Sequence, residues 1–222
     1  MNKLKVLNLY AGIGGNRKLW QDVEVTAVEY DPKIAAIYQD FFPNDTVIVG
    51  DDHQYLLDHY KEYNDGFIWG SPPCPTHSRV NYFLKGRGVI RYPDMKLYEE
   101  VIFLQHIFEG KYCIENVISY YEPLIKPQQS GRHFFWSNFK IPFIKSEISV
   151  GRMCGKKDEM GGETQADIRR RRHLNSGFDL SKYNFNTEQL INNCVDPEIG
   201  LSILNAARGI IAENKVEAGK LF

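Results

Sequence analysis

Short apolar runs alternate along the chain with stretches whose apolar positions recur every three or four residues. Runs rich in Val, Ile and Leu between glycines or acidic residues are typical of buried strands, and the recurring pattern is typical of amphipathic helices. The strands that we predict lie at 5–11, 24–31, 46–52, 66–74, 111–117 and 131–139. The helices that we predict lie at 12–23, 32–42, 53–63, 95–108 and 196–214.

This alternation predicts an α/β fold with a mostly parallel sheet and helices on both faces. From about residue 144 to residue 190 the hydrophobic period weakens into glycines and charges. We interpret 144–192 as either a small, irregular inserted recognition element or a partly mobile loop. It would separate a domain at 1–143 from a C-terminal helix within 193–222 that returns to the sheet.

Composition and charge exclude several classes of protein. With 43% hydrophobic and 25% charged residues and a net charge of -1, the chain reads as a globular protein that does not coat nucleic acid. The charge is uneven, because residues 126–173 carry eleven Lys and Arg against five Asp and Glu. No apolar run approaches the ~20 residues of a membrane span. The N-terminus follows no secretory cleavage pattern, so we expect a cytoplasmic protein.

The cysteines point to a nucleophile rather than to a metal. Four of them lie about forty residues apart without a CxxC pair, so we predict neither a zinc site nor a disulfide framework. Cys74 stands in "GSPPCPTHS", where prolines on both sides stiffen the chain. A thiol on such a constrained loop is a candidate for chemistry, although a lone cysteine is more often a buried small hydrophobe.

The carboxyl ends of the predicted strands carry residues suited to a nucleoside cofactor. In an open α/β sheet, ligands bind beyond these ends. Here glycines follow the first strand, and they let the backbone approach a ligand closely. Acidic residues follow the second and third strands, where they can accept hydrogen bonds from ribose hydroxyls. The chain lacks GxxxxGK[ST] and misses the GxGxxG spacing, so a ribose-containing cofactor without phosphate, such as S-adenosylmethionine, fits better than NAD or ATP.

These stretches are similar, in order, to the motifs of the cytosine-C5 DNA methyltransferases. "LYAGIGG", "VEYD" and "VGDD" resemble the cofactor motifs, "GSPPCPTHS" the catalytic motif and "IENV" the E-N-V motif. "GRHFFWSNF" is similar to the arginine-bearing strand, where His133 leaves one arginine instead of two, and "GLSILNAA" is a looser match to the last motif. The resemblance implies a Rossmann-like fold of the kind that uses S-adenosylmethionine for methyl transfer.

The resemblance implies a covalent reaction on a flipped-out cytosine in DNA. The Cys74 thiolate would add to C6, which makes C5 nucleophilic enough to take the methyl group and leaves S-adenosylhomocysteine. Glu115 would serve as the acid at N3, and Arg132 would contact the base carbonyl and hold the cysteine loop. The predicted cofactor residues are Tyr10, Ala11, Gly12, Gly14, Gly15, Glu29, Tyr30, Asp51, Asp52, Pro72, Leu97 and Ser202. The predicted substrate residues are Ser71, Pro73, Ser78, Arg79, Arg87, Arg91, Asn116 and Val117.

A basic loop follows the candidate nucleophile. It carries Arg79, Lys85, Arg87 and Arg91 without a carboxylate before Asp94, and we expect it to close over a nucleic-acid backbone. The run Arg169–Arg172 reads equally well as a solvated charge run or as phosphate contacts.

Other functions stay open. The same thiol chemistry could act on RNA or on a free pyrimidine nucleotide, and the short insertion leaves room for a separate recognition subunit. A regulatory DNA-binding subunit would require a broken catalytic set, which the chain does not have. A zinc deaminase is disfavoured because no HxE motif accompanies the cysteine. For a small cytosine-C5 methyltransferase, restriction-modification and phage protection both stay open as the biological setting.

Overall fold

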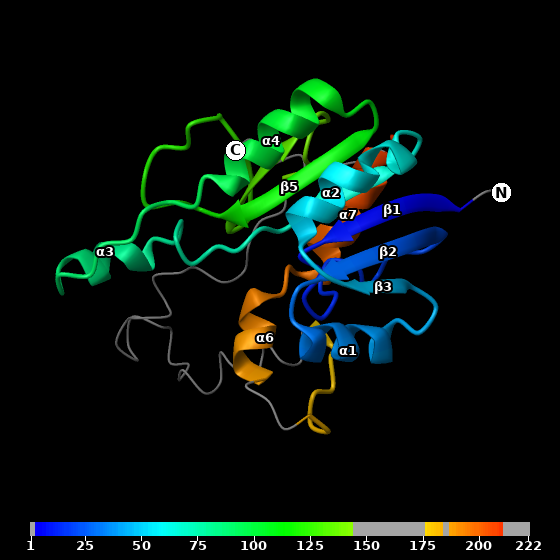
Figure 1. Cartoon of the computed structure of the whole chain (residues 1–222), viewed down its shortest axis with the longest axis horizontal. Coiled ribbons are helices and arrows are strands. Elements are labelled where there is room, and N and C mark those ends of the chain that lie inside the picture. Colours follow the sequence, from blue (N-terminus) through cyan, green and yellow to red (C-terminus); the bar gives the residue numbers. More distant parts are fainter. Residues whose placement is uncertain (1–2, 144–175, 184–186, 211–222) are drawn as a thin grey trace, which may run out of the picture.

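A single sheet of seven strands organises the described part of the chain (Figure 1). The computed structural model describes residues 3–143, 176–183 and 187–210. The strands are β1 Leu4–Leu9, β2 Val23–Glu29, β3 Thr46–Val49, β4 Phe67–Gly70, β5 Lys111–Val117, β6 Gln128–Ser130 and β7 His133–Ser137. The helices are α1 Pro32–Phe41, α2 Asp52–His59, η1 Tyr60–Tyr63, α3 Val80–Lys85, α4 Lys96–Ile107, α6 Thr187–Asn193 and α7 Pro197–Ala207.

The strand order is β3-β2-β1-β4-β5-β7-β6, and the pairs from β3 to β5 are parallel. β7 is antiparallel to both β5 and β6. The chain progresses outward in one direction from β1 to β3 and in the other from β4 to β5. This reversal makes the boundary between β1 and β4 the switch point at which α/β proteins bind ligands. Leu9 pairs with Gly70, so both strands end side by side there.

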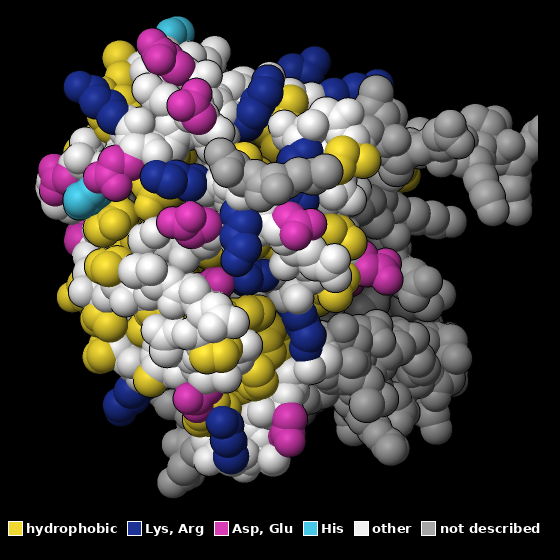
Figure 2. Space-filling view, turned by 90° about the vertical axis from the view of Figure 1, so that its right-hand side faces the viewer, with side chains coloured by type: hydrophobic (Ala, Val, Ile, Leu, Met, Phe, Trp, Pro, Cys, Tyr) yellow, Lys and Arg dark blue, Asp and Glu magenta, His cyan; other side chains and the backbone are white. Residues whose placement is uncertain are grey.

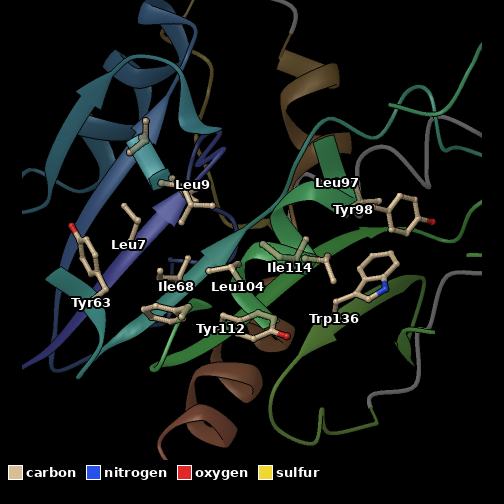
Figure 3. Packing of buried hydrophobic residues seen from close by; sticks show 14 residues of the cluster. Leu7, Leu9, Tyr63, Ile68, Leu97, Tyr98, Leu104, Tyr112, Ile114 and Trp136 are labelled. Atoms are coloured by element: carbon tan, nitrogen blue, oxygen red, sulfur yellow. The ribbon is translucent and has the colours of Figure 1, made fainter. Parts of the chain in front are cut away.

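Helices cover both faces of the sheet, which confirms the predicted layering. Leu7 and Leu9 of β1 enter one core with residues of α2 and α4 (Figure 3). Val6, on the opposite face of the same strand, enters a second core with residues of α7. The period-2 alternation of β1 therefore distributes its apolar side chains between two buried layers.

The predicted helix at 12–23 is wrong. Residues 12–19 contain turns with no helix, and the amides of Gly14, Arg17 and Trp20 each donate to a carbonyl three residues earlier. The Arg17 side chain holds this arrangement, because its guanidinium donates to the Trp20 carbonyl at 2.8 Å and to the Asp45 carboxylate at 2.8 and 2.9 Å.

The segment after residue 175 packs on α1. Phe178 meets Phe41 edge-on with ring centroids 4.7 Å apart, and the Tyr183 hydroxyl donates to Asp40 at 2.7 Å. Most of the predicted recognition insertion, 144–175, lies outside the described residues, as do Cys154 and Arg169–Arg172. The domain boundaries therefore stay a prediction.

The face at the amino ends of the strands carries mixed charge. Basic and acidic side chains alternate there without a broad area of one sign (Figure 2). Among the described residues, no helix is long and apolar enough to cross a membrane.

Candidate active site

The loop after β1 is fastened to the end of β2 by Glu29. The Ala11 amide donates to the Val28 carbonyl at 3.0 Å, which continues the β1–β2 pairing into the loop. One Glu29 oxygen accepts from the Gly12 amide at 2.9 Å and the other from the Asp31 amide at 3.0 Å. A single carboxylate thus orders the glycine loop and the start of α1.

Tyr10 connects this loop to two other elements. Its backbone is left-handed (φ 54°), and its amide donates to Asp52 Oδ1 at 2.5 Å. Its hydroxyl donates to Glu100 of α4, a fully buried carboxylate that also lies 3.1 Å from His53 Nδ1. The Glu100 hydrogen bond raises the pKa of His53, which favours the protonated ring.

Burial dominates the chemistry of Asp52. It raises the pKa of this carboxyl to about 8, and the negative charges of Glu29 and Glu100 push in the same direction. The Tyr10 amide opposes the shift without cancelling it. Asp52 is therefore largely protonated at neutral pH, and it acts as a neutral acceptor for the loop backbone.

The cysteine loop is held at both ends. The Trp69 indole donates to Ser71 Oγ at 2.8 Å, and the Asn116 amide group donates to the Pro72 carbonyl at 2.9 Å. The amides of His77 and Ser78 both donate to the Cys74 carbonyl, at 3.0 and 3.1 Å. Asn116 thus ties β5, which carries Glu115, to the loop that carries the thiol.

The Cys74 thiol is half-buried and protonated at rest. Burial raises its pKa, and the charge of Glu115 raises it further. A carboxylate that opposes thiolate formation sits at 7% exposure on the adjacent strand. The thiol and the carboxyl therefore form an electrostatically coupled pair in which a negative charge on one disfavours a negative charge on the other.

Two basic residues interact electrostatically with Glu115: His133, the first residue of β7, and Arg132, the residue before it. His133 Nε2 lies 3.6 Å from Glu115 Oε1. Burial lowers the pKa of His133, and the Glu115 charge opposes this shift. Burial also lowers the pKa of Arg132, against the charges of Glu115 and Asp196.

One cavity of about 510 Å³ joins the cofactor loop to the cysteine loop. It brings together most of the residues predicted from the sequence. These are Tyr10, Ala11, Gly12, Gly15, Glu29, Tyr30, Asp51, Asp52, Ser71, Pro72, Pro73, Cys74, Leu97, Glu115, Asn116 and Val117. Seven predicted residues are not part of its lining: Gly14, Ser78, Arg79, Arg87, Arg91, Arg132 and Ser202.

Gly14 is absent from the lining for a steric reason. It has φ 83°, and a Cβ added there would come within 2.3 Å of the Phe42 ring and 2.9 Å of the Tyr38 ring. The glycine therefore lets the loop pack tightly on α1 and does not face the ligand space.

Other lining residues were missed by the sequence interpretation. His53, His77, His133, Asp94 and Lys96 belong to elements that were predicted without a role for these side chains at the cavity. A second group comes from α6 and the residues after it: Gln189, Leu190, Asn192, Asn193, Cys194 and Val195. The apolar pair Leu190 and Ile191 was the available signal, but it is too short to establish a helical period.

No cluster of His, Cys, Asp or Glu among the described residues is arranged to hold a metal ion. The site combines the thiol of Cys74, the buried carboxyl of Glu115 and the imidazole of His133. The same cavity also contains the glycine loop after β1 and Glu29 at the end of β2. This set suits covalent catalysis beside a nucleoside cofactor.

The chain is similar to solved structures of other proteins. Entamoeba histolytica methyltransferase EhMeth aligns with a TM-score of 0.57 and 12% identity over 96% of this chain and 100% of that chain. A mutant of Spodoptera frugiperda DNMT2 aligns with a TM-score of 0.44 and 19% identity over 66% of this chain and 54% of that chain, so this chain spans about half its length. At 12% identity the EhMeth match shows the fold alone. No curated protein matches the chain.

The family is shown by a different comparison. A family model described as C-5 cytosine-specific DNA methylase matches residues 4–117, just over half of the 222 residues. This range runs from the start of β1 to the end of β5 and includes the glycine loop, Cys74 and Glu115. The chain therefore belongs to the C-5 cytosine-specific DNA methylase family.

Proposed function

We propose that the protein transfers a methyl group from S-adenosylmethionine to C5 of cytosine in DNA through a covalent adduct on Cys74. One observation carries the proposal: a single cavity is lined by Cys74 and Glu115 at one end and by the glycine loop with Glu29 at the other. Membership of the family implies that S-adenosylmethionine is the methyl donor. The substrate and the residue roles are our proposal.

The acidic end of the cavity fits this cofactor. Glu29 stands at the end of β2, where a carboxylate can accept ribose hydroxyls. Ile13, Ile34 and Leu97 give apolar walls for an adenine ring. A sulfonium cofactor carries positive charge, and Glu29 and Asp51 favour it over a cofactor that carries phosphates. When bound, S-adenosylmethionine supplies the methyl group.

The opposite end performs the addition to the base. Cys74 gives its proton to solvent, and Sγ then forms a bond to C6 while the C5–C6 electron pair becomes the C4–C5 double bond and the C4–N3 pair moves onto N3. Glu115, in its protonated form, donates a proton at N3, which neutralises the charge that develops there. After C5 has been methylated, the N3 proton returns to Glu115, the C5 proton passes to solvent, and departure of Sγ restores the C5–C6 double bond. Since the base must leave the stack for Sγ to reach C6, the substrate nucleotide is flipped out.

The arm between the cysteine loop and α4, residues 79–93, supports a nucleic-acid substrate over a free nucleotide. It holds α3 away from the sheet (Figure 1). Its cations Arg79, Lys85, Arg87 and Arg91 are exposed, with no carboxylate between Pro75 and Pro93. Tyr82, Phe83 and Tyr92 are 60%, 70% and 82% exposed on the same arm. Cations interleaved with exposed aromatic rings suit phosphates and bases together.

The deciding experiment is transfer of labelled methyl from S-adenosylmethionine to duplex DNA, single-stranded DNA, RNA and dCMP, with Cys74→Ala as the control. We expect label in DNA that disappears in the variant. Label only in RNA or dCMP would keep the chemistry and contradict the DNA assignment. Cofactor binding without transfer to any substrate would contradict the stand-alone enzyme and favour a separate recognition subunit.

A further inference from the structure

His133, and not Arg132, presents its side chain to the base end of the cavity. β7 pairs with β5 so that His133 lies opposite Val117 and Phe135 opposite Glu115. Paired residues of adjacent strands point to the same side of a sheet, so His133 shares a side with Glu115 and Val117. All three line the cavity with Cys74, whereas Arg132, one residue earlier, is not part of the lining.

The surroundings of the imidazole determine which nitrogen holds the proton. Nδ1 is buried and has no hydrogen-bond partner among the described residues. Nε2 faces the Glu115 carboxyl at 3.6 Å, within the range of an ion pair but too far for a hydrogen bond. A buried N–H without an acceptor is costly, so the proton belongs on Nε2, where the carboxyl favours it.

The same surroundings keep the ring neutral. A second proton would have to sit on Nδ1, where no acceptor meets it. Burial lowers the pKa of His133 most, and the charge of Arg132 lowers it further, against the charges of Glu115 and Asp196. His133 therefore offers one neutral N–H beside Glu115, and no acceptor among the residues that the structure describes lies at hydrogen-bond distance from this N–H.

We propose that His133 donates this hydrogen bond, from Nε2, to the C2 carbonyl of the bound cytosine, the contact that the sequence resemblance assigned to Arg132. The inference rests on the proposed function. Arg132 then remains a cation that interacts with the charges of Glu115 and Asp196 and supports the pocket without touching the base. A neutral donor thus holds the pyrimidine in place of a guanidinium. His133 contacts the C2 carbonyl, Glu115 contacts N3, and Cys74 contacts C6.

The test replaces the acceptor atom. An oligonucleotide with 2-thiocytosine at the target presents sulfur, a weaker acceptor, in place of the carbonyl oxygen. For the wild type we expect kcat/KM to be about 3- to 10-fold higher with oxygen than with sulfur, as one net hydrogen bond predicts. In His133→Ala this ratio should fall to about 1, and His133→Gln, which keeps a neutral N–H donor, should restore part of it.

Arg132→Gln is the matched control, and it should keep the wild-type ratio even where its overall rate falls. A loss of the ratio in Arg132→Gln, or a wild-type ratio in His133→Ala, overturns the inference and leaves the proposed function intact. Failure of the wild type to methylate ordinary cytosine overturns the proposed function and this inference together. Binding of S-adenosylmethionine, measured for each variant, shows whether its cofactor pocket is folded.

Discussion

At the scale of single residues, the surroundings of Cys74 oppose formation of its thiolate. The Glu115 carboxyl and burial both favour the thiol over the thiolate at Cys74. Two changes relieve this opposition: protonation of Glu115 or removal of its charge. The same proton that Glu115 would give to N3 thus also makes the thiolate easier to form.

Glu115→Gln should therefore lower the pKa of Cys74. We expect alkylation of Cys74 by iodoacetamide to reach its half-maximal rate at lower pH in the variant than in the wild type, in which the pKa is raised. Mass spectrometry of the peptide containing Cys74 separates it from the fully buried Cys113. A curve that does not move, or that moves to higher pH, would contradict the coupling between these two groups.

Asp52 should make the protein less stable as pH rises. Its pKa in the folded protein, about 8, lies above the ordinary value of 3.8, so its contribution to stability is fully present below pH 3.8 and is lost as pH rises towards 8. Asp52→Asn keeps an acceptor for the Tyr10 amide and removes the titration. In urea unfolding, we expect the wild type to lose at least about 1 kcal/mol relative to the variant between pH 5 and pH 8. Equal losses in both proteins would show that Asp52 is not buried as a neutral acid.

The sequence predicted single residues best where a motif specifies chemistry. Cys74, Glu115 and Glu29 lie in one cavity as expected, although their roles stay predictions. Arg132 and His133 show where prediction from the sequence fails. Only one of these two neighbours faces the cavity, and the register between β5 and β7 determines which one. That register is set by pairing with a strand about twenty residues away, which the letters "GRHFFW" do not encode by themselves.

At the scale of elements, the arm should act as an electrostatic contact to nucleic acid. For Arg87→Gln with Arg91→Gln we expect weaker DNA binding and a slope of log K against log salt that is smaller by about 2. The matched control is Lys5→Gln with Lys111→Gln, two exposed cations at the amino ends of β1 and β5. Fluorescence anisotropy at several salt concentrations measures both. Equal slopes in the two double variants would remove the arm from the interface.

Elements with a full apolar period were predictable, and short or locally braced ones were not. The strands β1 to β5 and the helices α1, α2, α4 and α7 lie within or close to their predicted ranges. The false helix at 12–23 carries helix-forming letters, but Arg17 and Asp45 brace a series of turns instead. Gly200 lets α7 pack directly against these turns, since a Cβ there would come within 2.2 Å of the Asn16 carbonyl. β6 is three polar residues long, and no pattern of that length predicts a strand.

At the scale of the whole molecule, the cavity depends on segments that are far apart in sequence. Its walls come from the loop after β1, the loop after β4, β5 and the chain around α6. A ligand that contacts all of these walls binds only the folded chain and stabilises it as a unit. Residues 79–93 of the arm do not line the cavity, so we expect the arm not to share in that stabilisation.

Hydrogen exchange should therefore respond unevenly to the cofactor. On addition of S-adenosylmethionine we expect the amides of residues 10–15 and 189–195 to exchange more slowly, because both segments line the cavity. Residues 82–90 of the arm should exchange as before. Strong protection of the arm with none at 189–195 would place the cofactor outside this cavity.

The long stretch of sequence between β7 and α7 has a consequence for synthesis. Every strand that the structure describes ends by Ser137, yet the helix that covers one face of the sheet begins at Pro197. At about 5–20 residues per second, a ribosome needs roughly 3 to 12 s to add the residues between them. During that interval α7 does not yet pack on Val6, Trp69 and Phe135. The nascent chain therefore exposes a hydrophobic surface that chaperones can bind and that is buried in the folded protein.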